Sequence, residues 1–72
     1  MDGVRFTEYS RYDPMRDAQV VRLMAITGRG TYHIEIPEYG PQPLRTLRRE
    51  FETRVQELID AGKPPCEVVL ED

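Results

Sequence analysis

Polar and apolar residues alternate along the first half of the chain, a pattern that is typical of β-strands. Residues 4–12, VRFTEYSRY, are rich in aromatic and β-branched residues and predict a first strand. An Asp-Pro pair opens residues 13–19, which we expect to form a loop or a single helical turn. Residues 19–26 and 31–37 predict two more strands, so the first half of the chain is expected to form a sheet.

The alternation also predicts the register of the hairpin between the second and third strands. A two-residue loop at Gly28-Arg29 gathers apolar partners on one face and pairs Arg22 with Glu35 on the other. A three-residue loop would mix apolar and charged residues on both faces, and a four-residue loop would lose the Arg22–Glu35 pair. We therefore predict the two-residue loop, in a type II′ turn that gives Gly28 a positive φ.

An amphipathic helix is predicted over residues 44–62. Its apolar stripe consists of Leu44, Leu47, Phe51, Val55, Leu58 and Ile59. Pro43 suits the first turn, and Gly62, followed by two prolines, is the expected left-handed terminator. Two i,i+4 ion pairs are expected on the exposed side: Arg48–Glu52 and Glu50–Arg54.

The last residues alternate again. Residues 66–71, CEVVLE, predict a final strand with Cys66, Val68 and Leu70 directed to the core. The resulting order β-β-β-α-β predicts an α+β fold, one mostly antiparallel sheet with a single helix packed on one face. Residues 1–72 are expected to form one small domain, whose core would supply no more than roughly 3–5 kcal/mol. Formation of a homodimer or binding to a protein partner remains open as a further source of stability.

One helix can cover only one face of such a sheet. The second face is expected to display Val20, Arg22, Met24, Ile26, Thr31, His33, Glu35 and Val69. Four apolar side chains among charges exceed what a solvated face needs, which indicates a docking or dimer face. The alternative is that residues 1–19 fold over this face.

Composition narrows the function classes. Ten basic and thirteen acidic residues give a net charge of −3, which disfavours a dedicated nucleic-acid binder. A single histidine and a single cysteine are too few for a structural zinc site or an internal disulfide. With no basic leader and no apolar span in the sequence, we expect a cytoplasmic protein without membrane contact.

Three small groups of residues suggest chemistry, but each has a simpler explanation. Gly28-Arg29-Gly30 leads into a strand rather than a helix, which favours a hairpin turn over a phosphate cradle. His33 and Glu35 share a strand face that offers neither a cleft nor exclusion of water. Cys66 beside a carboxylate is a poor nucleophile. We therefore expect a protein that is not an enzyme, with no catalytic residue, no cofactor and no metal.

A glycine turn followed by an aromatic-X-apolar-X-apolar-Pro-acidic strand end precedes the helix. It consists of Gly30, Tyr32, Ile34, Ile36, Pro37 and Glu38. This arrangement resembles the core of HicB-type antitoxins. In length and element order the chain is also similar to small phage proteins that inhibit bacterial RNA polymerase. The basic last-strand residues that contribute to binding in that group are replaced here by acidic ones, so no binding residue is carried over. Both resemblances imply a module that acts by protein–protein contact.

The resulting hypothesis is a non-enzymatic, protein-binding module of phage or bacterial type that inhibits or regulates a larger host protein. The expected contact residues are Arg22, Met24, Ile26, Arg29, His33 and Glu35. The alternative is a nucleic-acid-contacting regulatory module. It would use Arg5, Arg11, Tyr12, Arg16 and Arg29.

Overall fold

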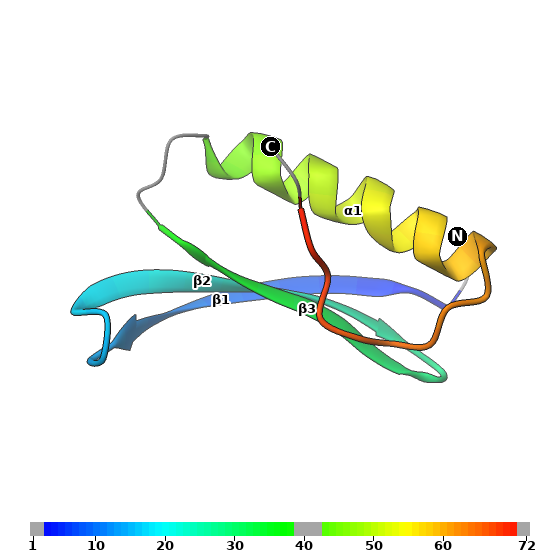
Figure 1. The fold of residues 1–72 in the computed structure, drawn as a ribbon, viewed down its shortest axis with the longest axis horizontal. Helices are drawn as coiled ribbons and strands as arrows, with labels where there is room; N and C mark the ends of the chain where they lie inside the picture. Colours follow the sequence, from blue (N-terminus) through cyan, green and yellow to red (C-terminus); the bar gives the residue numbers. More distant parts are fainter. Residues whose placement is uncertain (1–2, 39–42, 71–72) are drawn as a thin grey trace.

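The computed structural model describes residues 3–38 and 43–70 (Figure 1). The elements are β1 (Arg5–Asp13), β2 (Ala18–Thr27), β3 (Gly30–Pro37) and α1 (Leu44–Asp60). The strands form one antiparallel sheet in the order β1-β2-β3. Figure 1 shows α1 along one face of this sheet, with no other element of the described chain on the opposite face. The predicted α+β class, with one helix on an antiparallel sheet, is confirmed.

β1 and β2 form a hairpin that the sequence did not predict. The register is continuous from Arg5 opposite Ile26 to Asp13 opposite Ala18, and residues 14–17 make the turn. The Asp13 Oδ1 atom accepts a hydrogen bond from the Met15 backbone N–H at 3.0 Å, which holds the turn. Residues 5–13 and 18–19 therefore belong to the sheet itself. The alternative in which the N-terminal segment covers the second face is wrong for the described residues.

The hairpin between β2 and β3 has the predicted register. Thr27 lies opposite Gly30, and Arg22 lies opposite Glu35, which confirms the two-residue loop. The predicted turn type is wrong, because the positive φ belongs to Gly30, at +139°, and not to Gly28. The Thr27 hydroxyl holds this turn, since it donates to the Gly30 carbonyl oxygen at 2.8 Å and accepts from the Arg29 N–H at 3.1 Å.

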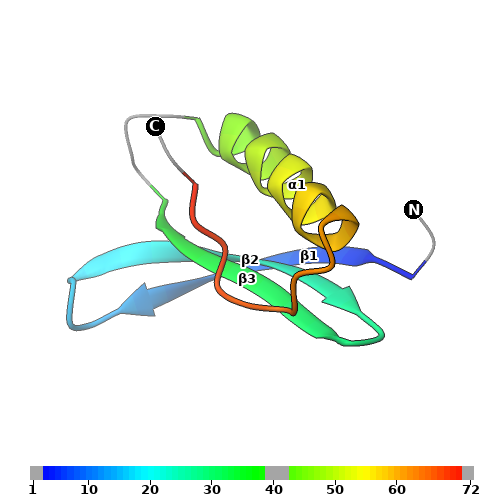
Figure 2. The ribbon, with the colours of Figure 1, turned by 45° about the vertical axis from the view of Figure 1, so that its right-hand side comes forward.

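α1 begins after Pro43 and ends in the predicted glycine cap. Gly62 has a φ of +74°, its N–H donates to the Ile59 carbonyl at 3.0 Å, and the Lys63 N–H donates to the Leu58 carbonyl at 2.9 Å. These two bonds are the pair that defines a Schellman cap. Figures 1 and 2 show α1 lying over the sheet and inclined in the same sense as β3.

The predicted ion pairs along α1 are wrong. Arg48 pairs instead with Glu8 of β1, and its Nη2 atom lies 2.8 Å from the Glu8 Oε2 atom. Arg54 pairs with Glu57, three residues along, at 3.2 Å. The Arg48 side chain reaches the sheet because its position on α1 faces β1. A contact between the helix and the sheet thus replaces a contact within the helix.

The core lies between α1 and the sheet face below it. Its buried members are Val21, Leu23, Ala25, Tyr32, Ile36, Phe51, Val55 and Val68. The apolar stripe predicted for the helix is confirmed, since Phe51 and Val55 are buried and the other four members pack against the cluster. The Phe6 ring of β1 meets the Phe51 ring edge to face, with centroids 6.4 Å apart.

The predicted last strand is wrong. Residues 66–70 make a single parallel bridge, between Glu67 and His33 of β3. Figures 1 and 2 show the chain running beside β3 and then turning up towards α1. Cys66 is exposed rather than directed to the core, and Val69 lines a surface hollow beside α1 instead of the second sheet face. Of the predictions for this segment, only the inward direction of Val68 and Leu70 is confirmed.

Candidate protein-binding surface

The sheet face opposite α1, here called the open face, is built from alternate residues of the three strands. It comprises Arg5, Thr7, Tyr9 and Arg11 of β1, Arg22, Met24 and Ile26 of β2, and Thr31, His33 and Glu35 of β3. The orientation of β1 follows from the contacts of Phe6 and Glu8 with α1, which turn the odd-numbered residues the other way.

The strand register arranges these side chains in three rows across the sheet. They are Tyr9–Arg22–Glu35, Thr7–Met24–His33 and Arg5–Ile26–Thr31. Side chains that are directly opposite on neighbouring strands lie close enough to interact. The first row is therefore charged and aromatic, while the next two present apolar β2 side chains between polar neighbours.

A shared carboxylate organises the charged row. The Glu35 Oε2 atom accepts hydrogen bonds from Arg11 Nε at 3.1 Å and Arg11 Nη2 at 2.8 Å, and the Arg22 Nη1 atom lies 3.7 Å from the same oxygen. The hydrogen bonds that Arg11 donates to Glu35 raise the pKa of Arg11, so this guanidinium stays charged at any physiological pH. Two guanidinium groups share one carboxylate, which leaves the cluster with a net positive charge.

The Arg11 side chain also changes the predicted extent of the open face. Arg11 lies opposite Val20, whereas Glu35 lies one row further along, so Arg11 must cross β2 to reach it. Val20 is only 1 % exposed, although the sequence predicts it on the second face. It is buried because the Arg11 side chain and Pro37, its partners in the register, flank it. The prediction that Val20 is displayed is wrong.

The apolar part of the open face is accessible. Ile26 is 40 % exposed, Tyr9 is 46 % exposed, and Met24 is half-buried between them. His33 is half-buried, and its backbone is held to residues 66–68, because its N–H donates to the Cys66 carbonyl and its carbonyl accepts from the Val68 N–H at 2.7 Å. The structure therefore brings five of the six predicted contact residues onto one face.

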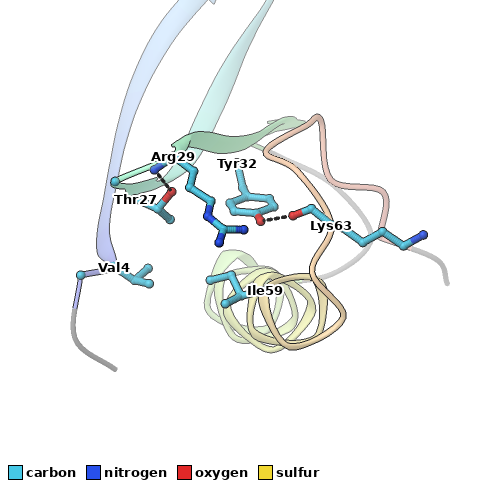
Figure 3. Close-up of a pocket in the computed structure, with 8 residues that line it drawn as sticks. Val4, Thr27, Arg29, Tyr32, Ile59 and Lys63 are labelled. Carbon is cyan, nitrogen blue, oxygen red and sulfur yellow. Dashed lines mark hydrogen bonds between the residues drawn. The ribbon is translucent and has the colours of Figure 1, made fainter.

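Arg29 is the predicted contact residue that lies elsewhere. Figure 3 shows its side chain directed to the α1 side of the sheet, towards Tyr32 and Ile59. It lines an open pocket of about 380 Å³ together with Gly3, Val4, Thr27, Gly28, Tyr32, Ile59 and Lys63. Two of these lining residues are joined by a hydrogen bond, which the Tyr32 hydroxyl donates to the Lys63 carbonyl oxygen at 2.7 Å. Arg29 belongs to this pocket and not to the open face.

The residues of the nucleic-acid alternative do not form one surface. Arg5 and Arg11 lie on the open face, but Tyr12 alternates to the other face of β1. Arg16 lies in the turn between β1 and β2, and Arg29 lies in the turn at the opposite end of β2. The five residues are therefore spread over both faces and both ends of the sheet.

No group of three histidine, cysteine or acidic side chains among residues 3–38 and 43–70 is arranged to hold a metal ion. Glu35, the acidic neighbour of His33, is occupied by two arginines and is not poised as a base. In the described part of the chain, no helix is long and apolar enough to span a membrane.

Sequence reasoning missed Tyr9 and Arg11 as members of the open face. Both residues lie in the predicted first strand, but its pairing with β2 was not predicted, so its side chains could not be assigned to a face. The sequence does allow this pairing to be predicted, since a four-residue turn at residues 14–17 places Arg5 opposite Ile26 and Tyr9 opposite Arg22.

Comparisons with known proteins add no relative. No family model, no curated protein and no solved structure significantly matches this chain. The functional proposal therefore rests on the geometry and chemistry of the described residues.

Proposed function

We propose that this chain is a small protein-binding module that inhibits or regulates a larger partner protein by docking on the open face. The observation that carries the proposal is that α1 covers one face of the sheet and leaves Met24 and Ile26 accessible on the other. Accessible apolar side chains in the middle of a sheet, flanked by ordered charges, are typical of a contact surface.

The chemistry of the open face indicates what kind of protein surface fits it. Ile26 and Tyr9 supply apolar area, and burying a side chain such as isoleucine contributes about 1.5–3 kcal/mol. Arg5 and the Arg11–Arg22–Glu35 cluster add a net positive charge. The complementary partner presents an apolar side chain surrounded by carboxylates. The charges would set orientation and association rate, while the apolar contacts would supply most of the affinity.

A protein partner fits better than a nucleic acid for two reasons. The chain has a net charge of −3, whereas nucleic-acid-binding domains are generally basic. The arginines of the open face are also partly neutralised by Glu35, which would face the phosphates at close range. The same carboxylate poses no such problem for a protein surface of mixed charge.

Affinity capture with matched variants tests the proposal. The immobilised protein is incubated with nuclease-treated lysate of the native host, in parallel with Ile26→Asp and Val69→Asp. Val69 is a suitable control because it is also an exposed β-branched residue, at 65 %, but lies beside α1. Circular dichroism first establishes that all three proteins are folded.

The proposal predicts one larger protein that is retained by the wild type and by Val69→Asp, lost with Ile26→Asp, and still retained at high salt. Apolar contacts tolerate salt, whereas phosphate contacts weaken steeply with it. Equal retention by Ile26→Asp would place the binding surface elsewhere. Retention that occurs only in a parallel lysate without nuclease treatment would instead support the nucleic-acid alternative.

A further inference from the structure

The outer edge of β1 has no partner among the described residues. β1 ends the sheet, and no segment within residues 3–38 and 43–70 pairs with its outer side. The strand is nine residues long and pairs with β2 without a bulge. It also contains no proline. Long, regular edge strands of this kind are templates for pairing with another chain.

The side chains of β1 are also poorly buried. Phe6, Tyr9 and Tyr12 are 44 %, 46 % and 51 % exposed, so half of the large apolar side chains that the described residues expose lie on this strand. Phe6 and Tyr12 alternate to the side of α1, while Tyr9 lies on the open face. A second strand added at this edge would contact aromatic side chains on both faces of the sheet.

We propose that β1 pairs antiparallel with β1 of a second copy of this chain, about a two-fold axis at Tyr9. A two-fold axis through an antiparallel strand pair places residues of the same face opposite each other, so the numbers of paired residues add to an even value. With the axis at Tyr9 they add to 18, and the whole of β1 is paired.

The side chains of β1 are self-complementary in this register. Arg5 lies opposite Asp13 of the second copy, and Phe6 lies opposite Tyr12, and by symmetry each pair occurs twice. Opposite charges and aromatic pairs are favourable cross-strand partners. The charged side chains of the strand also have partners within each chain. Glu8 pairs with Arg48, Arg11 shares Glu35 with Arg22, and the Asp13 Oδ2 atom lies 3.5 Å from the Arg16 Nε atom.

The neighbouring registers are worse. In the register where paired residue numbers add to 16, Arg5 lies opposite Arg11 and Glu8 opposite Glu8, which are like-charge pairs. In the register where they add to 22, Arg11 lies opposite Arg11. Numbers that add to 20 avoid these contacts but leave Phe6 beyond the paired segment. Numbers that add to 14 leave the other end, from Ser10, unpaired. Charge and apolar contact thus select the axis at Tyr9.

The dimer goes beyond the proposed docking function and does not depend on it. A two-fold axis perpendicular to the sheet puts both copies of α1 on one side and joins the two open faces on the other. The result is one continuous sheet of twice three strands, with a doubled contact surface.

The oligomeric state and the register are tested separately. Light scattering on the purified full-length protein is expected to show twice the chain mass of 8.4 kDa, falling towards the single mass on dilution. A single mass at every concentration would overturn the proposal. Ile26→Asp is expected to leave the dimer intact, so loss of partner binding and loss of dimerisation are distinguishable.

Single cysteines then report the register. In a Cys66→Ser background, Tyr9→Cys is expected to form an intermolecular disulfide on mild oxidation, because the two positions face each other across the axis. Thr7→Cys is the matched control on the same face. Its two copies would lie four residues apart along the strand, about 14 Å, which is beyond disulfide reach. Cross-linking of Thr7→Cys in preference to Tyr9→Cys would overturn the register.

A charge reversal provides a second readout. Arg5→Asp sets like charges against Asp13 at both ends of the dimer, and we expect the dissociation constant to rise roughly tenfold. The double variant Arg5→Asp with Asp13→Asn removes the like charges, keeps the Oδ1 acceptor of the Met15 N–H, and is expected to recover part of the association. Failure of the double variant to recover, in a protein that circular dichroism shows to be folded, would contradict the Arg5–Asp13 pairing.

Discussion

Val55 is the side chain through which the docking of α1 on the sheet is tested most simply. It is 0 % exposed and belongs to the core cluster, together with Phe51 of the same helix. α1 is the single helix of the described chain, so the apolar sheet face beneath it depends on this contact. Replacing Val55 with alanine should therefore weaken the fold as a whole.

The expected cost follows from the buried carbon atoms that are lost. Val→Ala removes two methyl-sized groups, worth about 0.8 kcal/mol each in transfer free energy, and leaves a cavity that adds to this. We expect Val55→Ala to lower the free energy of unfolding by about 2–3 kcal/mol. In a domain of this size, each kcal/mol shifts the melting temperature by about 4–8 °C. The melting temperature should fall by roughly 10–20 °C.

Thermal and urea unfolding followed by far-ultraviolet circular dichroism measures this loss. Val69→Ala makes the same chemical change at a residue that is 65 % exposed, and it should alter the free energy of unfolding by no more than about 0.5 kcal/mol. If Val55→Ala and Val69→Ala were equally stable, α1 would not be docked on the sheet through this side chain, and the assignment of an open face would fail with it.

Three further predictions concern single contacts. Gly30→Ala should lower the free energy of unfolding by about 1–3 kcal/mol, because φ is +139° and the added Cβ would lie 3.1 Å from a proline side chain. Gly28→Ala should be nearly neutral, and urea unfolding compares the two variants. Glu8→Gln should cost up to about 1 kcal/mol near neutral pH. The Arg48 hydrogen bond lowers the pKa of Glu8 below its ordinary value of 4.5, so the difference between wild type and Glu8→Gln should vanish as the pH falls below that value, and a constant difference would refute this pairing. Val20→Ala, at a buried site outside the main core cluster, should destabilise by about 1–3 kcal/mol in thermal unfolding, and a neutral result would mean that the Arg11 side chain does not cover it.

The elements with strong local signals could be predicted from the sequence. The register of β2 and β3 followed from period-two alternation, since any slip by one residue would have placed Glu35 among core residues. The extent of α1 followed from its apolar stripe, and its end followed from Gly62, whose left-handed backbone conformation suits glycine. Each of these signals lies within a short stretch of chain, which is why residues could be assigned without knowledge of the fold.

The contacts between distant segments could not be predicted in this way. β1 does not sort apolar from polar residues, because α1 covers it only in part, at Phe6 and Glu8, and its side chains are mostly exposed on both faces. Its pairing with β2 was therefore missed. Arg48 pairs with Glu8, forty residues away, and no spacing along the helix indicates that choice. The last segment alternates like a strand, yet only Glu67 bridges to β3 before the chain rises towards α1.

The unpredicted pairing of β1 with β2 also limited how much of the open face could be predicted. Met24, Ile26, His33 and Glu35 were assigned to one face correctly, because the β2–β3 register alone places them there. The β1 contribution, including the Arg11 side chain that orders Glu35 and covers Val20, required the tertiary pairing.

Photo-cross-linking in the native host tests the central claim, that the open face contacts a larger protein, most directly. A photoreactive phenylalanine analogue is introduced at Met24 of the open face or at Thr53, an exposed position on α1. We expect a cross-link to a larger protein from position 24 and none to that protein from position 53. A cross-link to that protein from position 53 alone, or equally from both positions, would contradict it.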